Sequence, residues 1–330
     1  MFFKEMNPMG TDVLIIGAGI SGLLAATELR RQGYSVCLLD KGRGVGGRMS
    51  TRRMQGARLD HGAQFFTVRD QRFQAYVDEW LDAGVVREWF RHLPGENDGP
   101  GHPRYCGING MNAVPKWLAR DLDVHSSERV NCLIRNVDQW VAQTESGDSF
   151  SASHLIVTTP LPQALLLLET AGLDWANGDL QRLRAVRYEM GLATMVILDG
   201  PSEVPAPGGM KLDRGHLSWI ADNRMKGISP DVNALTLHAT AEFARAHWNS
   251  PDAVRGPRMI GAAELWLGSR VVDYACHRWG FTLPLNPWPK RFYQNTSLNL
   301  VLAGDAFGGP RVEGAVLSGI EAAATIGQLV

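Results

Sequence analysis

A glycine-rich turn near the start of the chain constrains the fold more than any other feature. The apolar run 13–16 leads into the segment Gly17-Ala18-Gly19-Ile20-Ser21-Gly22, and residues 23–31 follow with a helical pattern. This order is typical of the βαβ unit that binds a dinucleotide. The first glycine permits the tight turn, the second lets the backbone approach a diphosphate, and the third lets the helix pack on the strand. The helix N-terminus would direct free N–H groups at the phosphates.

The second strand supports this interpretation. The apolar run 35–39 ends at Asp40. An acidic residue about 20 positions beyond the glycines usually accepts a hydrogen bond from a ribose hydroxyl. The order of strand, turn, helix, strand and acid predicts an α/β fold with a Rossmann-type domain, but it does not distinguish NAD from FAD.

Patterns along the rest of the chain predict a second domain. Residues 92–103, rich in Pro, Gly, Asn and Asp, indicate a loop. Apolar periodicity predicts helices over 71–86, 113–122, 241–248, 257–267 and 313–329. It predicts strands over 132–137, 139–143, 155–158, 181–198, 215–220, 234–239 and 298–303.

Charge and cysteine content exclude several classes of protein. The 33 Lys and Arg residues nearly balance 34 Asp and Glu residues, so no net field attracts nucleic acid or an anionic membrane. Residues 1–10 contain no apolar run of signal-peptide length, and the run 164–168 is too short to span a bilayer. The four cysteines lack CxxC spacing and disulfide density, so we expect a cytoplasmic protein without a metal site. They are Cys37, Cys106, Cys132 and Cys276.

The segment after Asp40 favours FAD. Residues 41–51 read Lys41-Gly42-Arg43-Gly44-Val45-Gly46-Gly47-Arg48-Met49-Ser50-Thr51. They resemble the amine-oxidase-like flavoproteins, in which a GGRxxT motif follows the acid of the second strand. The two adjacent glycines let the chain bend close under a cofactor, and Arg48 can set a guanidinium against a diphosphate.

A second nucleotide motif lies near the other end of the chain. Leu302-Ala303-Gly304-Asp305-Ala306 resembles the flavoprotein motif in which an aspartate binds the ribityl chain. The helix that opens at 312–315 would point its amides at the flavin pyrimidine and stabilise negative charge there. Residues 155–160 also resemble the strand that closes an FAD domain.

A narrower resemblance, to the renalase family and particularly its bacterial members, covers nearly the whole chain. The segments that carry it are Asp40-Lys41, 46–49, His61-Gly62-Ala63-Gln64-Phe65-Phe66, Gly304-Asp305, 313–315 and Cys276-His277-Arg278-Trp279. The resemblance implies that segment 61–66 lies along the flavin and that segment 276–279 is a loop beside the flavin ring. Gly280-Phe281, which follows, departs from the family pattern.

These motifs together imply a two-dinucleotide-binding-domain flavoprotein with non-covalent FAD and a smaller α+β substrate domain. We expect the FAD-binding domain over 1–74, 108–162 and 291–330, and the substrate domain over 75–107 and 163–290. The residues expected to bind FAD are Gly17, Ala18, Gly19, Ile20, Ser21, Gly22, Asp40, Lys41, Gly47, Arg48, Gly62, Ala63, Gln64, Val130, Gly304, Asp305, Glu313, Gly314 and Ala315.

The resemblance also implies an activity: oxidation of the 2-dihydro and 6-dihydro isomers of NAD(P)H to NAD(P)+. Flavin N5 would take the hydride, and molecular oxygen would accept the electrons to give hydrogen peroxide. Candidate substrate-facing residues are His61, Gln64, Arg278 and Trp279. His61 can be an acid, a base or a buried hydrogen-bonding residue. Alternatives are an amine or polyamine oxidase, a redox-neutral flavin isomerase, or a non-catalytic binding protein on the same fold.

Overall fold

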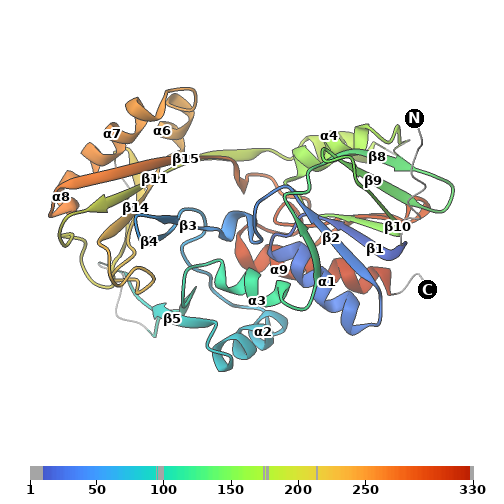
Figure 1. The fold of residues 1–330 in the computed structure, drawn as a ribbon, viewed down its shortest axis with the longest axis horizontal. Helices are drawn as coiled ribbons and strands as arrows, with labels where there is room; N and C mark the ends of the chain where they lie inside the picture. The colour runs from blue at the N-terminus through green and yellow to red at the C-terminus, as the bar shows by residue number, and fades with distance from the viewer. Residues whose placement is uncertain are drawn as a thin grey trace. The chain divides into compact units, whose positions relative to one another are not determined.

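The computed structural model describes residues 10–93, 95, 100–173, 175, 178–212 and 215–327. The chain divides into two compact units (Figure 1). Unit 1 comprises Met1–Gly47, Leu118–Arg187 and Asn286–Val330, and unit 2 comprises Arg48–Trp117 and Tyr188–Leu285. The expectations for 1–9, for 94 and 96–99 within the loop, and for 328–329 at the end of the last helix lie outside the described residues.

Unit 1 contains a mixed sheet in the order β16-β17-β10-β1-β2-β7, extended by β9 and β8. Pairings β10-β1, β1-β2, β2-β7 and β10-β17 are parallel. Its strands are β1 (Thr11–Ile16), β2 (Val36–Asp40), β7 (Asp123–Ser126), β8 (Val130–Arg135), β9 (Trp140–Thr144), β10 (Ser149–Val157), β16 (Tyr293–Asn295) and β17 (Leu300–Leu302). The central parallel strands are almost entirely buried, which explains their continuous apolar sequence.

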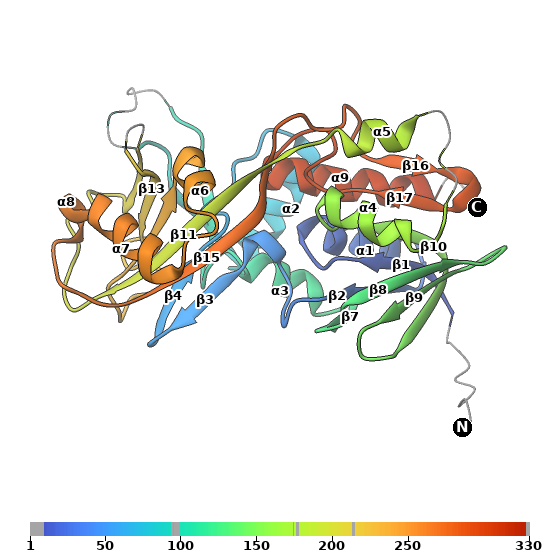
Figure 2. The same ribbon diagram turned by 90° about the horizontal axis from the view of Figure 1, so that it is seen from above.

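Two helices from opposite ends of the chain lie together on this sheet. They are α1 (Ile20–Arg31) and α9 (Arg311–Ile326) (Figure 2). A Cβ at Gly319 would lie 2.2 Å from the carbonyl oxygen of Ser21, so only glycine permits this approach. Both ends of the sequence therefore build one nucleotide-binding unit, as the two motifs predict. Unit 1 also contains α4 (Leu161–Glu169) and α5 (Asp179–Arg184).

Unit 2 contains an antiparallel sheet in the order β12-β13-β14-β11-β15, together with the hairpins β3-β4 and β5-β6. The sheet strands are β11 (Tyr188–Leu198), β12 (Gly209–Lys211), β13 (Leu217–Asp222), β14 (Ala234–Ala239) and β15 (Val271–Pro284). The hairpin strands are β3 (Thr51–Met54), β4 (Ala57–Asp60), β5 (Val86–Phe90) and β6 (Arg104–Gly107). The helices of unit 2 are α2 (Gln71–Asp82), α6 (Ala241–Ala246), α7 (Asp252–Ala262), α8 (Glu264–Leu267) and most of α3 (Ala113–Ala119). Two short 3-10 helices are η1 (Gly47–Met49), mostly in unit 2, and η2 (Thr296–Leu298) in unit 1.

Strand β11 shows why both faces of the unit 2 sheet are covered. Its side chains alternate between two apolar clusters. Leu192 and Val196 pack with Phe243 and Met259 of α6 and α7. On the opposite face Met195 and Ile197 pack with Ala57 and Leu59 of β4. Hairpin β3-β4 is thus part of the core of unit 2.

Several sequence expectations need correction. The strand expected over 181–198 is wrong in its first part, because residues 179–184 form α5, with Asp179 in its first turn and basic residues in its last. The segment 276–279, expected to be a loop, lies inside the 14-residue strand β15 and pairs with β11. The two compact units also differ from the expected domains. Residues 48–74 and 108–117, expected in the FAD-binding domain, group with unit 2, and residues 163–187 and 286–290, expected in the substrate domain, group with unit 1. The residues expected to contact FAD stay a prediction.

Among the described residues, every helix is too short or too polar to cross a membrane.

Candidate functional site

The first predicted cofactor element is the turn between β1 and α1 in unit 1. Gly17 has a φ of 110°, a conformation that favours glycine, and its carbonyl accepts a hydrogen bond from Thr158 Oγ1 at 2.9 Å. Helix α1 has Gly19 at its N-cap, where no side chain caps the first-turn N–H groups. The Ser21 hydroxyl is buried and has no partner among the described residues. This turn therefore offers unfilled donors where a diphosphate is expected.

Asp40 and the adjacent glycines meet this turn. Asp40 Oδ2 accepts a hydrogen bond from Ala18 N at 2.7 Å, and Gly46 N donates to Ala18 O at 2.8 Å. A Cβ at Gly47 would lie 3.8 Å from Gly19 Cα. A Cβ at Gly19 would meet nothing within 4 Å, so the backbone is open there. Unit 1 thus brings the fingerprint, the acid and the glycine pair together, and their geometry fits a dinucleotide.

Lys41 and Val130 are two further residues expected to bind FAD, and both make contacts within unit 1. Lys41 Nζ donates to Gln163 Oε1 at 3.0 Å, and burial lowers the pKa of Lys41. Val130 begins β8 and pairs with Thr144.

The C-terminal motif lies at the start of α9. Gly304 has a φ of 126°, and its N–H donates to Ser318 Oγ at 2.8 Å, which ties the turn after β17 to the helix. Asp305 is almost fully buried. Pro310 at the N-cap provides no side-chain cap, so the first-turn N–H groups near Glu313, Gly314 and Ala315 are not capped by a side chain. An N-terminus of this kind favours a ligand that develops negative charge.

Arg48 and segment 61–64 form a second set of predicted residues, in unit 2. Arg48 Nη1 donates to the Phe281 carbonyl at 3.1 Å, and Ala63 N donates to the Arg48 carbonyl at 2.8 Å. A Cβ at Gly62 would lie 2.0 Å from the Arg48 carbonyl oxygen. Gly62 therefore allows the close backbone contact with Arg48 that holds residues 61–64 against the GGR motif.

His61 lies in an aromatic cluster. Its ring stacks on Trp279 with centroids 5.3 Å apart, and the Trp279 Nε1–H donates to the His61 carbonyl at 2.7 Å. The His277 ring meets His61 edge-on at 4.8 Å. Burial, followed by the neighbouring His277, lowers the pKa of His61 to about 4. Burial, followed by the charge of Arg52, also lowers the pKa of His277. The cluster is uncharged near neutral pH.

The side-chain amide of Gln64 contacts a backbone carbonyl, a histidine ring and a lysine ammonium. Nε2 donates to the Asp60 carbonyl at 2.6 Å and lies 3.4 Å from His238 Nε2. Oε1 accepts from Lys226 Nζ at 3.5 Å. Burial, followed by the neighbouring charges of His61 and Lys226, lowers the pKa of His238 to about 4. This orientation of Gln64 makes His238 Nε2 the acceptor, so the neutral ring carries its proton on Nδ1.

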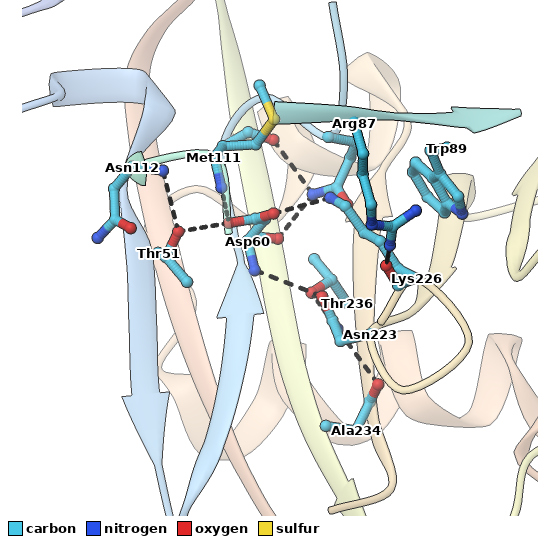
Figure 3. Close-up of polar contacts among 12 residues, drawn as sticks. Thr51, Asp60, Arg87, Trp89, Met111, Asn112, Asn223, Lys226, Ala234 and Thr236 are labelled. Atoms are coloured by element: carbon cyan, nitrogen blue, oxygen red, sulfur yellow. Dashed lines mark hydrogen bonds and ion pairs between the residues drawn. The ribbon is translucent and has the colours of Figure 1, made fainter. Parts of the chain in front are cut away.

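Asp60 and Lys226 form a buried ion pair (Figure 3). Lys226 Nζ lies 2.8 Å from Asp60 Oδ2, and both side chains have 0% exposure. Asp60 Oδ1 accepts hydrogen bonds from Thr51 Oγ1 at 2.5 Å and from Met111 N at 2.8 Å. The ammonium also lies 4.7 Å from the centre of the Trp89 ring. These contacts compensate part of the desolvation cost of two buried charges.

Arg278 and Trp279 do not share a surface. Neighbouring side chains of a strand point to opposite faces. Trp279 lies with His61, whereas the Arg278 guanidinium is exposed and lies 5.6 Å from the centre of the Trp248 ring. The structure thus brings His61, Gln64 and Trp279 together and separates Arg278 from them.

Several residues of this region were missed by the sequence analysis: Arg52, Asp60, Lys226, His238 and His277. Asp60 immediately precedes the HGAQFF segment, and a polar residue at the end of a strand was a usable signal. Lys226, by contrast, follows β13 in a turn, and no local pattern marks it as buried.

One group in the described part of unit 1 has metal-ligand chemistry. Atoms of Cys37, Asp123 and His125 lie within 4.8 Å of one another, on adjacent strands β2 and β7. His125 Nε2 already lies 3.1 Å from Asp123 Oδ1, and burial raises the pKa of the Cys37 thiol to about 12. These contacts account for the cluster without an ion.

The Rossmann-type unit and its two nucleotide motifs define a flavin-dependent oxidoreductase. Two family models match the chain: an NAD(P)-binding Rossmann-like domain over residues 15–80 and a flavin containing amine oxidoreductase over residues 96–327. The second model covers more than half of the chain, which therefore belongs to the flavin containing amine oxidoreductase family. Its cofactor is FAD, as the motifs predict.

Individual relatives agree with this family. Renalase from Mus musculus is 23% identical over 329 residues, which cover 93% of this chain and 96% of the mouse protein. A putative protoporphyrinogen oxidase from Exiguobacterium sp. 255-15 has a similar fold, with a TM-score of 0.74, 13% identity, and coverage of 97% of this chain and 99% of the other. Wild-type putrescine oxidase bound to putrescine gives a TM-score of 0.72 and 16% identity, with the same coverage. The expected renalase-like, two-motif flavoprotein fold is confirmed.

Proposed function

We propose that this FAD-dependent oxidoreductase oxidises the 2-dihydro and 6-dihydro isomers of NAD(P)H to NAD(P)+. In the balanced reaction, one isomer, one dioxygen and one proton give NAD(P)+ and hydrogen peroxide. Bound FAD would supply the two-electron acceptor for the hydride. The similarity to renalase over nearly the whole chain supports this substrate class.

The observation that carries the proposal is the uncharged cluster around His61. A dihydropyridine loses hydride from carbon and becomes an aromatic pyridinium, so no N–H proton has to leave. The reaction needs a flat surface for the ring and no general base. Trp279 is half-buried and stacks on the buried His61 with ring centroids 5.3 Å apart, so its other face can serve as such a surface. Because the pKa of His61 is about 4, its protonation state does not change between about pH 6 and pH 9.

Amine oxidation is the alternative on this fold. An amine must lose its ammonium proton before hydride transfer, so its oxidation depends on pH or on a base. The amine-oxidase hypothesis calls for a lysine in the site. Lys226 is the buried lysine of unit 2, but its side chain is fully enclosed and paired with Asp60. It is engaged in structure, and this favours the dihydropyridine substrate.

FAD contacts remain part of the proposal. We assign them to the residues that the sequence motifs predict: Gly17 to Gly22, Asp40, Lys41, Gly47, Arg48, Gly62, Ala63, Gln64, Val130, Gly304, Asp305, Glu313, Gly314 and Ala315. Binding is non-covalent. Acid denaturation is expected to release all of the yellow colour into the supernatant, and colour in the protein pellet would contradict this assignment.

Anaerobic stopped-flow reduction tests the reaction. The purified FAD-loaded protein is mixed with a 6-dihydro-NAD isomer between about pH 6 and pH 9, and the visible flavin absorbance is followed. We expect fast bleaching whose rate changes little over this interval. A rate that rises about tenfold per pH unit, or faster bleaching by simple amines, would favour an amine oxidase. No bleaching by any donor would favour a non-catalytic binding protein.

A matched pair of tryptophan variants tests the surface. Trp279→Ala removes the ring that stacks on His61, whereas Trp248→Ala removes a ring that contacts Arg278 on the other face of β15. We expect Trp279→Ala to raise the KM of the dihydro isomer while FAD content stays constant. An equal change in Trp248→Ala would indicate a general packing defect.

A further inference from the structure

Hairpin β3-β4 places two arginines directly opposite each other. Its turn residues Gln55 and Gly56 have φ angles of 46° and 83°, as in the type I′ turn that connects the two strands of a hairpin with a two-residue loop. This turn fixes the register, in which Arg53 pairs with Arg58. Like charges at directly opposed positions destabilise an antiparallel pair. The hairpin therefore carries an electrostatic cost that an anion between the two guanidinium groups would remove.

The two arginines line a pocket of about 200 Å³ in unit 2. The other lining residues are Thr51, Asn109, Asn112, Ala113 and Lys116. Lys116 on α3 adds a third positive charge, and none of the described lining residues is acidic. Within the described part of the chain, neither the Arg53 guanidinium nor the Lys116 ammonium forms a side-chain hydrogen bond or an ion pair. The pocket therefore concentrates positive charge without an internal counterion.

The uncharged residues of the pocket also suit an anion. Arg58 Nη1 donates to Asn109 Oδ1 at 3.1 Å, and this orientation leaves the Nδ2–H groups of Asn109 as donors. The nearby carboxylate of Asp60 does not neutralise the pocket. It is fully buried and is engaged by Lys226, Thr51 and Met111 (Figure 3).

The pocket is distinct from the cluster around His61. Thr51, Arg53 and Arg58 share one face of the hairpin, because side chains alternate and opposed residues point the same way. Arg52 is opposite Leu59, which packs on the sheet through the other face. None of the residues proposed to bind FAD lines the pocket.

We propose that this pocket, formed by Arg53, Arg58 and Lys116, is a binding site for a phosphate group. Its volume is large enough for a phosphate group, and guanidinium groups match the geometry of phosphate oxygens. The ligand is either inorganic phosphate or the 2′-phosphate of a nucleotide. The site does not depend on the proposed oxidation, since none of its residues is among those expected to bind FAD or to face the substrate.

Inorganic phosphate is the first probe. Isothermal titration of the full-length, FAD-saturated protein at low salt and constant ionic strength is expected to show one saturable site. Arg53→Gln and Lys116→Gln should each raise the dissociation constant by about twofold to fivefold. Lys211→Gln, an equal charge change at an exposed position of β12, should leave it unchanged. Absence of saturable binding, or an equal loss in Lys211→Gln, would overturn the site.

Thermal stability provides a readout that does not require a titration signal. Without phosphate, Arg53→Gln should be at least as stable as the parent protein, because it removes the Arg53–Arg58 repulsion. With phosphate, the melting temperature of the parent should rise and that of Arg53→Gln should rise less. An equal rise in both proteins would contradict the proposal.

Two nucleotides distinguish the sources of the phosphate group. NADP+ carries a 2′-phosphate and NAD+ lacks one. If the ligand is a nucleotide phosphate, NADP+ should displace inorganic phosphate in the parent but not alter the low affinity of the Arg53→Gln variant, and NAD+ should be ineffective. If neither nucleotide competes while phosphate binds, the ligand is the free anion. Each result supports a phosphate site and identifies its source.

Discussion

The ammonium of Lys226 lies 2.8 Å from the carboxylate of Asp60, and neither side chain is exposed to solvent. Asp60 ends β4, and Lys226 lies in the turn after β13, so the pair joins the hairpin to the main sheet of unit 2. The Lys226 carbonyl also accepts a hydrogen bond from Arg87. One ion pair therefore organises the turn at Met111, the amide of Gln64 and the loop after β13.

Removing one partner of this pair should be far more costly than removing both. Lys226→Met leaves the Asp60 carboxylate buried without a counterion, and we expect a loss of about 3–5 kcal/mol in the free energy of unfolding. The double variant Asp60→Asn/Lys226→Met should recover part of the lost free energy of unfolding. Urea denaturation measures both. Arg270→Met, which breaks an exposed pair with Asp199, serves as the control and should have little effect. A mild effect of Lys226→Met would mean that water reaches Asp60.

Gly19→Val should abolish FAD binding without unfolding the protein. In the structure, a Cβ at Gly19 meets nothing within 4 Å, so the fold has room for a side chain that the diphosphate needs for itself. The ratio of visible to ultraviolet absorbance measures FAD content, and far-ultraviolet circular dichroism checks the fold. Gly261→Val, at an equally open position of α7, should retain FAD. Stoichiometric FAD in Gly19→Val would refute the assignment of the fingerprint.

Stability should fall as pH decreases from 7 to 5. His61 and His238 have a native pKa of about 4 and an ordinary value of 6.5. Below pH 6.5 the unfolded chain takes up protons that the native state does not bind, and the loss ends only near pH 4. Each histidine contributes a decrease of about 2 kcal/mol between pH 7 and pH 5. Urea midpoints measure it, and the decrease should be smaller in His61→Asn. Identical pH dependence in the variant would contradict a buried, neutral His61.

Arg52 should matter more than Arg278 for an anionic dinucleotide. The charge of Arg52 acts on both His61 and His277, whereas Arg278 lies against Trp248 on the opposite face of β15. We expect Arg52→Gln to raise the KM of a dihydro-NAD isomer by about twofold to fivefold. Arg278→Gln should change it little, and FAD content should stay constant in both. The reverse order would restore Arg278 as the substrate contact expected from sequence.

Local sequence patterns predicted the nucleotide-binding unit well. The order of β1, the glycine turn, α1, β2 and Asp40 follows from short-range signals, since turn geometry and strand length depend on neighbouring residues. A similar local signal existed for the phosphate pocket. The two-residue turn Gln55-Gly56 sets Arg53 opposite Arg58, so the pairing of the two arginines depends on local sequence alone.

Other features depended on contacts between distant segments. Segment 276–279 is a strand because β11 supplies a hydrogen-bonding partner along its length, and that pairing places Arg278 and Trp279 on opposite faces. Lys226 is buried because Asp60, 166 positions away, provides its counterion. The sequence by itself determined the class of fold, the cofactor and the motifs that bind it, since these follow from local backbone geometry. Only the tertiary structure decided which charges are paired, which histidines stay neutral and which arginines share a surface, because burial and electrostatic interactions depend on neighbours that the chain brings together only when it folds.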